Sequence, residues 1–278
     1  MTNPIDQTGR TVLVTGGTMG IGLACALAFA AQGAQTIVTY RWGTADMDEV
    51  RARFAAAGGP GPLLLEADAS QDDDTAALME AIAQRFERVD VLVSNVAFAL
   101  KTETFDAYSR RSLHRSIDYS AWPLAAYTQA IKTRLGQYPR HVIGMSSPGP
   151  DDFFMNYDFV AASKSVLETF CRYMNFRLFD DGVKVNVVRS RLVRTASYDA
   201  TFGDEFHAFL RSLGGFEDCY TTPEEVANVV LMLASGFCDA VGGQIVTVDK
   251  GFEFFDNLMG IAERARRRGK RLGELLND

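Results

Sequence analysis

Three side chains with exchangeable protons lie close together in the stretch from Ser146 to Lys164. Ser147 follows a continuous apolar run, residues 141–145, that predicts a buried strand, and Tyr157 lies near the start of the helical pattern that carries Lys164. A hydroxyl, a phenol and an ammonium at the end of a buried strand favour acid–base chemistry. Tyr157 precedes Lys164 by seven residues, which is about 10.5 Å along a helix axis. We therefore expect Tyr157 to reach the site only from the loop before the helix or with its ring leaning inward.

The segments that must position these groups alternate between strand and helix. Short aliphatic and β-branched runs predict seven buried strands, at residues 10–15, 36–40, 63–65, 89–93, 141–145, 183–188 and 244–249. Amphipathic patterns of helical period separate most of them. This alternation predicts an α/β fold, a Rossmann-like doubly wound parallel sheet with helices on both faces. With 47% apolar residues in a length of 278, the chain can bury the core of one such domain.

We assign residues 1–252 to this single domain. Residues 189–222 contain aromatics and glycines without a clean strand pattern, and we interpret them as a small helical lid over the site. Residues 253–278 form a basic helical tail, with six basic residues between Ile261 and Leu272. The tail is either a solvated or disordered end, or a contact with a neighbouring subunit or a phosphate group.

A glycine-rich loop follows the first predicted strand and leads into an alanine-rich helix. It reads Thr-Gly-Gly-Thr-Met-Gly-Ile-Gly over residues 15–22. Such a loop directs backbone N–H groups and a helix N-terminus at a phosphate, and glycine lets the backbone approach closely. An ordinary tight turn is the alternative. The phosphate interpretation makes these residues candidates for binding a cofactor: Gly16, Thr18, Met19, Gly20 and Ile21.

Arg41 follows the second predicted strand, where a nucleotide-binding sheet reads the ribose of its cofactor. An acidic residue there binds a free 2′-hydroxyl, whereas arginine suits a 2′-phosphate. We therefore expect NADPH in preference to NADH.

Composition excludes several classes of protein. A net charge of −7 argues against a general nucleic-acid-binding protein. No apolar run has the length of a membrane span and no leader pattern opens the sequence, so we expect no membrane association and a cytoplasmic location. The four cysteines and three histidines have no ligand-like spacing, so we expect no metal site.

Several motifs together resemble the short-chain dehydrogenase/reductase family over residues 8–252. They are the glycine loop, the pair Asp68-Ala69, a degraded Asn-Asn-Ala-Gly motif around Asn95, the segment 185–195 and the sequence Val-Asp-Lys-Gly at 248–251.

The resemblance implies roles for individual residues. Asp68 and Ala69 would contact adenine, while Asn95, Val193 and Thr195 would line the cofactor site. Lys164 would bind the nicotinamide ribose and lower the pKa of a nearby phenol. It also implies a homodimer or homotetramer that pairs through the helices of residues 105–135 and 156–179.

The sequence departs from the family pattern at the catalytic positions. The family's tyrosine lies four residues before the lysine, and this position is Val160 here. The helical asparagine of the usual tetrad aligns with Asp118, and Ser190-Arg191 replaces a proline–glycine pair. The spacing from Tyr157 to Lys164 instead resembles the enoyl-carrier-protein reductase branch of the family.

Three functions are compatible with this pattern. The first, which we favour from the sequence, is an NADPH-dependent ketoreductase acting on a bulky, aromatic secondary metabolite. Its proton donor would be Tyr157, a water held by Ser147 and Lys164, or the substrate's own hydroxyl. It resembles antibiotic-pathway angucyclinone ketoreductases that lack the tyrosine. The second is an enoyl-thioester reductase that uses Tyr157, and the third is a catalytically silent NADP-binding protein. An aromatic wall supports the first: Phe98, Phe153, Phe154, Tyr157, Tyr198, Phe202 and Phe206.

Overall fold

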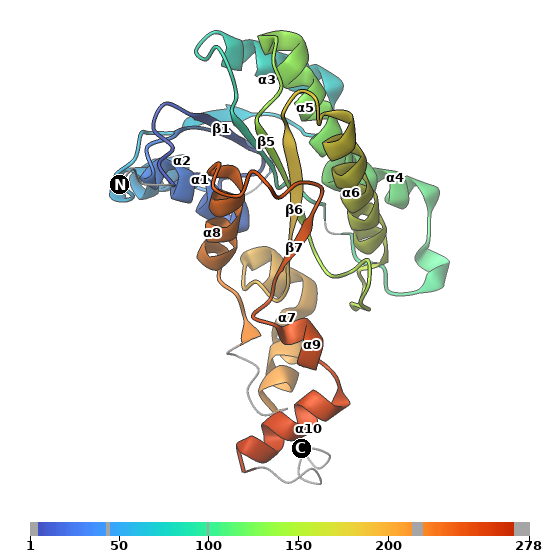
Figure 1. Ribbon diagram of the computed structural model, residues 1–278. Helices are drawn as coiled ribbons and strands as arrows, with labels where there is room; N and C mark the ends of the chain where they lie inside the picture. Colours follow the sequence, from blue (N-terminus) through green and yellow to red (C-terminus); the bar gives the residue numbers. More distant parts are fainter. Residues whose placement is uncertain (1–4, 43–44, 99, 213–218, 270–278) are drawn as a thin grey trace.

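A seven-stranded parallel sheet forms the centre of the molecule (Figure 1). The computed structural model describes residues 5–42, 45–98, 100–212 and 219–269. The strand order is β3-β2-β1-β4-β5-β6-β7, which is the doubly wound arrangement predicted from the sequence. The strands are β1 Thr11–Val14, β2 Gln35–Tyr40, β3 Leu63–Glu66, β4 Val91–Ser94, β5 His141–Ser146, β6 Lys184–Ser190 and β7 Ile245–Val248.

Helices cover both faces of this sheet (Figure 1). One face carries α1 Gly20–Ala31, α2 Met47–Ala56 and α8 Pro223–Ala234. The other carries α3 Asp72–Ala83, α4 Arg110–Ser120, α5 Trp122–Leu135 and α6 Asp158–Arg177. A short 3-10 turn, η1 Phe105–Ala107, precedes α4.

Successive side chains of each strand point to opposite faces of the sheet, so the core has one part on each face. In β1, Val12 and Val14 pack with α1 and α8, whereas Leu13 between them packs with the helices of the opposite face. All three are fully buried. Because successive side chains of a strand point to opposite faces, a strand covered on both sides reads as a continuous apolar run. That is the pattern that made the strands recognisable in the sequence.

A smaller lobe projects beyond the carboxyl ends of β6 and β7 (Figure 1). It contains α7 Ala196–Ser212, α9 Phe252–Phe255 and α10 Leu258–Arg267. Its own apolar cluster includes Leu192, Tyr198, Cys219 and Phe252. The segment predicted as a lid corresponds to α7 and the residues around it, apart from residues 213–218, which lie outside the described part.

The predicted basic tail is helical where it is described. The last turn of α10 carries Arg264, Arg266 and Arg267, and Glu263 binds the latter two at 2.8 and 2.9 Å. Lys270 and Arg271 belong to the stretch 270–278, outside the described residues. Within the described residues, no helix has both the length and the apolar character needed to span a membrane.

Candidate functional site

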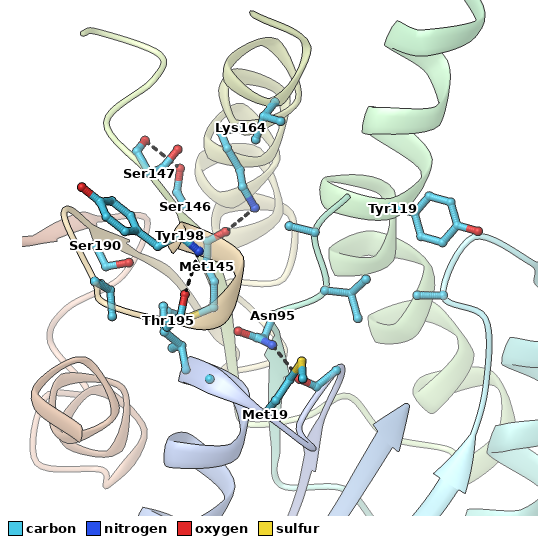
Figure 2. A pocket seen from close by; sticks show the side chains of 18 of the residues that line it. Met19, Asn95, Tyr119, Met145, Ser146, Ser147, Lys164, Ser190, Thr195 and Tyr198 are labelled. Carbon is cyan, nitrogen blue, oxygen red and sulfur yellow. Dashed lines mark hydrogen bonds between the residues drawn. The ribbon is translucent and has the colours of Figure 1, made fainter. Parts of the chain in front are cut away.

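The carboxyl ends of the central strands open into a cleft of about 400 Å³ (Figure 2). Loops after β1 to β6 and the first turns of α6 form most of its walls. Of the residues predicted for the site, all except Asp68 line this cleft. The sheet has thus brought together groups that are spread over residues 16–195 of the sequence.

Asn95 holds the glycine loop against the end of β4. Its Nδ2 donates hydrogen bonds of 3.0 Å to the carbonyl oxygens of Thr15 and Gly16. Gly16 and Gly20 have positive φ angles of 62° and 54°, which favour glycine. A Cβ at Gly22 would lie 2.4 Å from the Gly16 oxygen and 2.5 Å from Asn95 Nδ2. The loop therefore packs closely enough to present bare backbone to a ligand.

The N-terminus of α1 faces the same cleft. Met19 is its N-cap residue and makes no side-chain capping hydrogen bond, and Met19, Gly20 and Ile21 all line the cleft. A helix N-terminus without a side-chain cap offers backbone N–H groups and a positive dipole end to an anion. These features fit the pyrophosphate of a dinucleotide cofactor.

Arg41 lies at the end of the cleft that is formed by β2 and β3. Its guanidinium pairs with Glu66 and lies 3.9 Å from Asp68 Oδ2. The Arg41 side chain is 45% exposed, so it can be reached by a ligand without unfolding of this edge. A 2′-phosphate bound here would compete with Glu66 for the same guanidinium.

The Asp68 carboxylate is engaged inside the protein. It accepts hydrogen bonds from Tyr119 Oη at 3.0 Å and from the Ser70 hydroxyl at 2.8 Å. Burial opposes its ionisation, but the hydrogen bonds from Ser70 and Tyr119 and the charge of Arg41 outweigh burial and lower the pKa of Asp68. The neighbouring Ala69 lines the cleft, whereas Asp68 does not. Asp68 therefore acts here as a structural anchor between the end of β3 and α4.

Tyr157 enters the cleft from the turn that begins α6. It is the N-cap residue, with φ −113° and ψ 6°, and follows Asn156 in the left-handed region at φ 60°. Its hydroxyl donates a 3.1 Å hydrogen bond to Ser147 Oγ. Burial raises the pKa of Tyr157, and the hydrogen bond with Ser147 offsets part of the rise. The phenol is therefore protonated at neutral pH and able to donate a proton.

Lys164 lies deeper, beneath the end of β5. Its Nζ donates a 2.8 Å hydrogen bond to the carbonyl oxygen of Met145, to which it points in Figure 2. Burial lowers the pKa of Lys164 to about 8, against the opposing influence of the Glu168 carboxylate. The amine is therefore still mostly cationic at neutral pH. Val160 lines the cleft one turn before Lys164 and offers only hydrocarbon at the usual tyrosine position.

A buried ion pair connects these elements. Arg189, near the end of β6, binds Glu168 through two parallel contacts, Nε to Oε1 at 3.0 Å and Nη2 to Oε2 at 2.6 Å. Ser146 Oγ donates to Glu168 Oε1 at 2.8 Å, and Arg189 Nη1 contacts Asp151 Oδ2 at 2.5 Å. The pair thus joins β5, α6, β6 and the loop that leads to Tyr157.

A profile described as enoyl-(acyl carrier protein) reductase matches residues 16–253. The chain belongs to this family of short-chain dehydrogenases/reductases. An enoyl-[acyl-carrier-protein] reductase [NADH] of Aquifex aeolicus is 26% identical over 266 residues, covering 92% of this chain and 94% of that protein. An uncharacterized oxidoreductase of Methylorubrum extorquens is 31% identical over 251 residues, covering 87% and 97%.

A solved structure shares the fold. It is a short-chain dehydrogenase of Burkholderia cenocepacia in complex with NADP, with a TM-score of 0.76 and 23% identity over 88% of this chain and 98% of that one. The chain is an oxidoreductase of this family with a pyridine-nucleotide-binding fold. The Aquifex protein is named for NADH, and the Burkholderia structure contains NADP.

Several residues singled out in the sequence lie outside the cleft. Asp118, which aligns with the usual tetrad asparagine, is exposed on α4 and does not line the cleft. Of the expected aromatic wall, only three members line the cleft: Phe154, Tyr157 and Tyr198. Phe98 packs beside Trp42 and Tyr119, Phe153 is 86% exposed, and Phe206 packs in the small lobe. The side chain of Phe202 lies outside the described part.

Three side chains in or next to the site were not predicted from the sequence. Trp42 lines the cleft with its ring centre 5.1 Å from that of Tyr119. Glu168 and Arg189 are charged yet 4% and 7% exposed. The sequence contains a signal for such partners. Arg189 and Arg191 lie at the end of an apolar strand and just after it, and a buried charge requires a partner.

Proposed function

We propose that the protein is an NADPH-dependent reductase of enoyl thioesters. The observation that carries this proposal is the position of Tyr157, whose hydroxyl reaches Ser147 in the cleft although the usual tyrosine position is Val160. The spacing from Tyr157 to Lys164, and the match of residues 16–253 to the enoyl-(acyl carrier protein) reductase profile, support it. The catalytic residues would be Ser147, Tyr157 and Lys164.

Each of these residues has a task that its environment supports. Bound NADPH would supply a hydride to C3 of the enoyl thioester, and negative charge would develop on the thioester oxygen. The Tyr157 hydroxyl donates a hydrogen bond to that oxygen and stabilises the enolate, with Ser147 orienting the phenol. The Lys164 ammonium holds the nicotinamide ribose and adds positive charge to the site. A proton from solvent water, transferred to C2 of the enolate, would then complete the reduction.

NADPH is proposed as the cofactor because of Arg41. Its exposed guanidinium at the end of β2 can bind a 2′-phosphate in exchange for its contact with Glu66. The glycine loop, the N-terminus of α1 and the residues Asn95, Val193 and Thr195 would hold the remainder of the dinucleotide.

Oxidation of NADPH in the presence of crotonyl-coenzyme A tests the proposal. We expect turnover by the wild type and a loss of about a hundredfold or more in Tyr157→Phe, because the enolate loses the hydrogen bond from the phenol. Tyr173→Phe is the matched control, since Tyr173 is on α6 but 67% exposed, and it should be as active as wild type. Thioester turnover that is unaffected by Tyr157→Phe would contradict the role of this residue.

Reduction of a ketone is the second candidate. The hydrogen-bonded pair of Ser147 and Tyr157 could equally bind the oxygen of a ketone, including that of a bulky aromatic polyketide beside Phe154 and Tyr198. Turnover of quinone-like ketones without turnover of any thioester would favour this function. Tight NADPH binding without any turnover would instead indicate a silent nucleotide-binding protein.

We also infer a homodimer or homotetramer. Three aromatic side chains on α6 and the segment after it are strongly exposed: Tyr173 at 67%, Phe176 at 75% and Phe179 at 63%. Apolar groups concentrated on one helix are typical of an interface. Light scattering on the purified protein tests this, and a strictly monomeric protein would contradict it.

A further inference from the structure

Arg191 forms part of the cleft wall and packs against the loop between Ser147 and Tyr157. It follows β6, it is only 8% exposed, and it lines the cleft with Phe154 and Tyr198. The short-chain reductase pattern has glycine at this position, which has no side chain to place there. The proposed reaction does not use Arg191, so this large buried side chain needs another explanation.

Four side chains fix the guanidinium of Arg191. Its Nη1 donates to Asp152 Oδ2 at 2.5 Å, and its Nη2 donates to Asp256. Its Cζ lies 5.4 Å from the ring centre of Phe154 and 5.2 Å from that of Phe252. A planar guanidinium held by two carboxylates and two aromatic rings has little freedom to swing away. Arg191 is therefore a rigid part of the wall.

The charges around Arg191 indicate which ligands the wall accepts. One guanidinium is shared by Asp152 and Asp256, so the three groups together carry a net negative charge. A wall of this kind does not attract a carboxylate or a phosphate at the far end of a substrate. The aromatic side chains Phe154 and Tyr198 also line the cleft, and they suit an apolar group.

We propose that Arg191 limits the length of the acyl chain and makes the protein selective for short, uncharged enoyl thioesters. The inference rests on the proposed function, because it names the substrate class of the same site. The large side chain fills space that glycine would leave open at the end of β6, and Asp152 and Asp256 prevent it from moving aside. A long acyl chain directed along this wall would have to displace the whole ion-paired group.

The test compares crotonyl-, octenoyl- and dodecenoyl-coenzyme A as substrates with NADPH. For the wild type we expect kcat/KM to be at least about tenfold higher for crotonyl- than for dodecenoyl-coenzyme A. In Arg191→Gly this ratio should fall by about tenfold or more, because space opens for the longer chain. A wild type that reduces all three equally well, or a folded Arg191→Gly with an unchanged ratio, would overturn the proposal.

Two further variants separate volume from charge. Arg191→Met keeps an unbranched side chain in the wall and removes the charge, so most of the preference for crotonyl-coenzyme A should remain. Arg194→Gly is the matched control, since Arg194 is exposed and does not line the cleft, and the ratio should equal that of wild type. If Arg191→Gly does not fold, the double variant Asp152→Ala with Asp256→Ala replaces it. This variant releases the guanidinium and should lower the same ratio; an unchanged ratio would overturn the proposal.

A binding measurement distinguishes failure of this inference from failure of the proposed function. If the wild type reduces no enoyl thioester, the proposed function is wrong. The wall is then tested by calorimetric titration of the wild type and Arg191→Gly with butyryl- and lauroyl-coenzyme A. If Arg191 limits the chain length, Arg191→Gly should increase the affinity for lauroyl-coenzyme A relative to butyryl-coenzyme A by about tenfold. Equal affinity ratios in the two proteins would overturn it.

Discussion

The two halves of the cleft are held in place by different interactions. The cofactor half depends on backbone and small residues: the glycine loop packs against β4 through one amide side chain, Asn95, and Gly22 leaves room for that contact. The substrate half depends on buried charges. Arg189 and Arg191 on one side bind the adjacent residues Asp151 and Asp152 on the other.

This difference explains why the two halves agree unequally with the family pattern. A loop that binds pyrophosphate through its backbone requires glycine at a few positions, whatever the substrate. A wall built from ion pairs can change with the substrate while the sheet remains the same. Each of the following predictions perturbs one half and measures the interaction that is expected to hold it.

The largest expected effect is in the substrate half. Arg189→Met leaves Glu168 as a buried carboxylate without its main partner, which should lower the free energy of unfolding by about 3–5 kcal/mol. Urea unfolding measures this. The double variant Glu168→Leu with Arg189→Met should recover most of the loss, because no unpaired charge remains. Arg134→Met, which removes an exposed pair with Glu80, should change the free energy of unfolding little. An equal loss in Arg189→Met and Arg134→Met would contradict the role of burial.

The pKa of Lys164 gives the next effect. Because burial lowers this pKa from 10.5 to about 8, the unfolded chain binds more protons than the folded protein between these values. The cost of burying the ammonium is therefore fully present below about pH 8 and is relieved as the pH rises towards 10.5. Relative to Lys164→Met, the wild type should become more stable by up to about 3 kcal/mol across this window. Urea unfolding of both proteins at several pH values tests it, and parallel pH profiles would contradict it.

In the cofactor half, Gly22→Ala introduces a Cβ that would lie 2.4 Å from the Gly16 oxygen. Because backbone on both sides must shift, we expect a loss of about 1–3 kcal/mol in the free energy of unfolding. Binding of NADPH, followed by fluorescence titration, should weaken as the loop moves. Gly61→Ala is the matched control, since its Cβ would meet nothing within 4 Å. Wild-type NADPH affinity in a folded Gly22→Ala would show that the loop does not need this close contact.

The smallest expected effect concerns the choice of nucleotide. Arg41→Ala removes the candidate partner of the 2′-phosphate and should weaken NADPH binding by about tenfold, with NADH binding unchanged. Arg51→Ala removes an exposed arginine of α2 that pairs with Asp48 and should change neither affinity. Equal weakening of NADPH and NADH would assign Arg41 to the adenine or ribose rather than to the phosphate.

The cofactor half has a clearer local pattern in the sequence than the substrate half. The glycine loop could be found because strand, loop and helix are adjacent in the chain, so that local pattern fixes their geometry. The surroundings of Asp68 and Asp118 could not be predicted, because alignment to a motif gives the position of a residue and not the direction of its side chain. Asp68 points inward to Tyr119 and Ser70, and Asp118 is exposed on α4.

The sequence by itself determined the order of strands and helices, the glycine loop, and the spacing of Ser147 and Lys164, which match the family pattern around position 160. These features depend on periodicity and on the conformational freedom of glycine, which act over a few residues. Only the tertiary structure decided whether Tyr157 reaches Ser147, because this depends on the left-handed turn at Asn156 and on the burial of the ring.

The tertiary structure also decided the partners of Arg189, in β6, and of Arg191, just after it. Arg191 binds Asp152 and Asp256, which are 39 and 65 residues away in the sequence. Such a pairing depends on which loops meet at the carboxyl edge of the sheet. It cannot be predicted from a local sequence pattern, because the free energy of a buried charge depends on the partners that the fold brings to it.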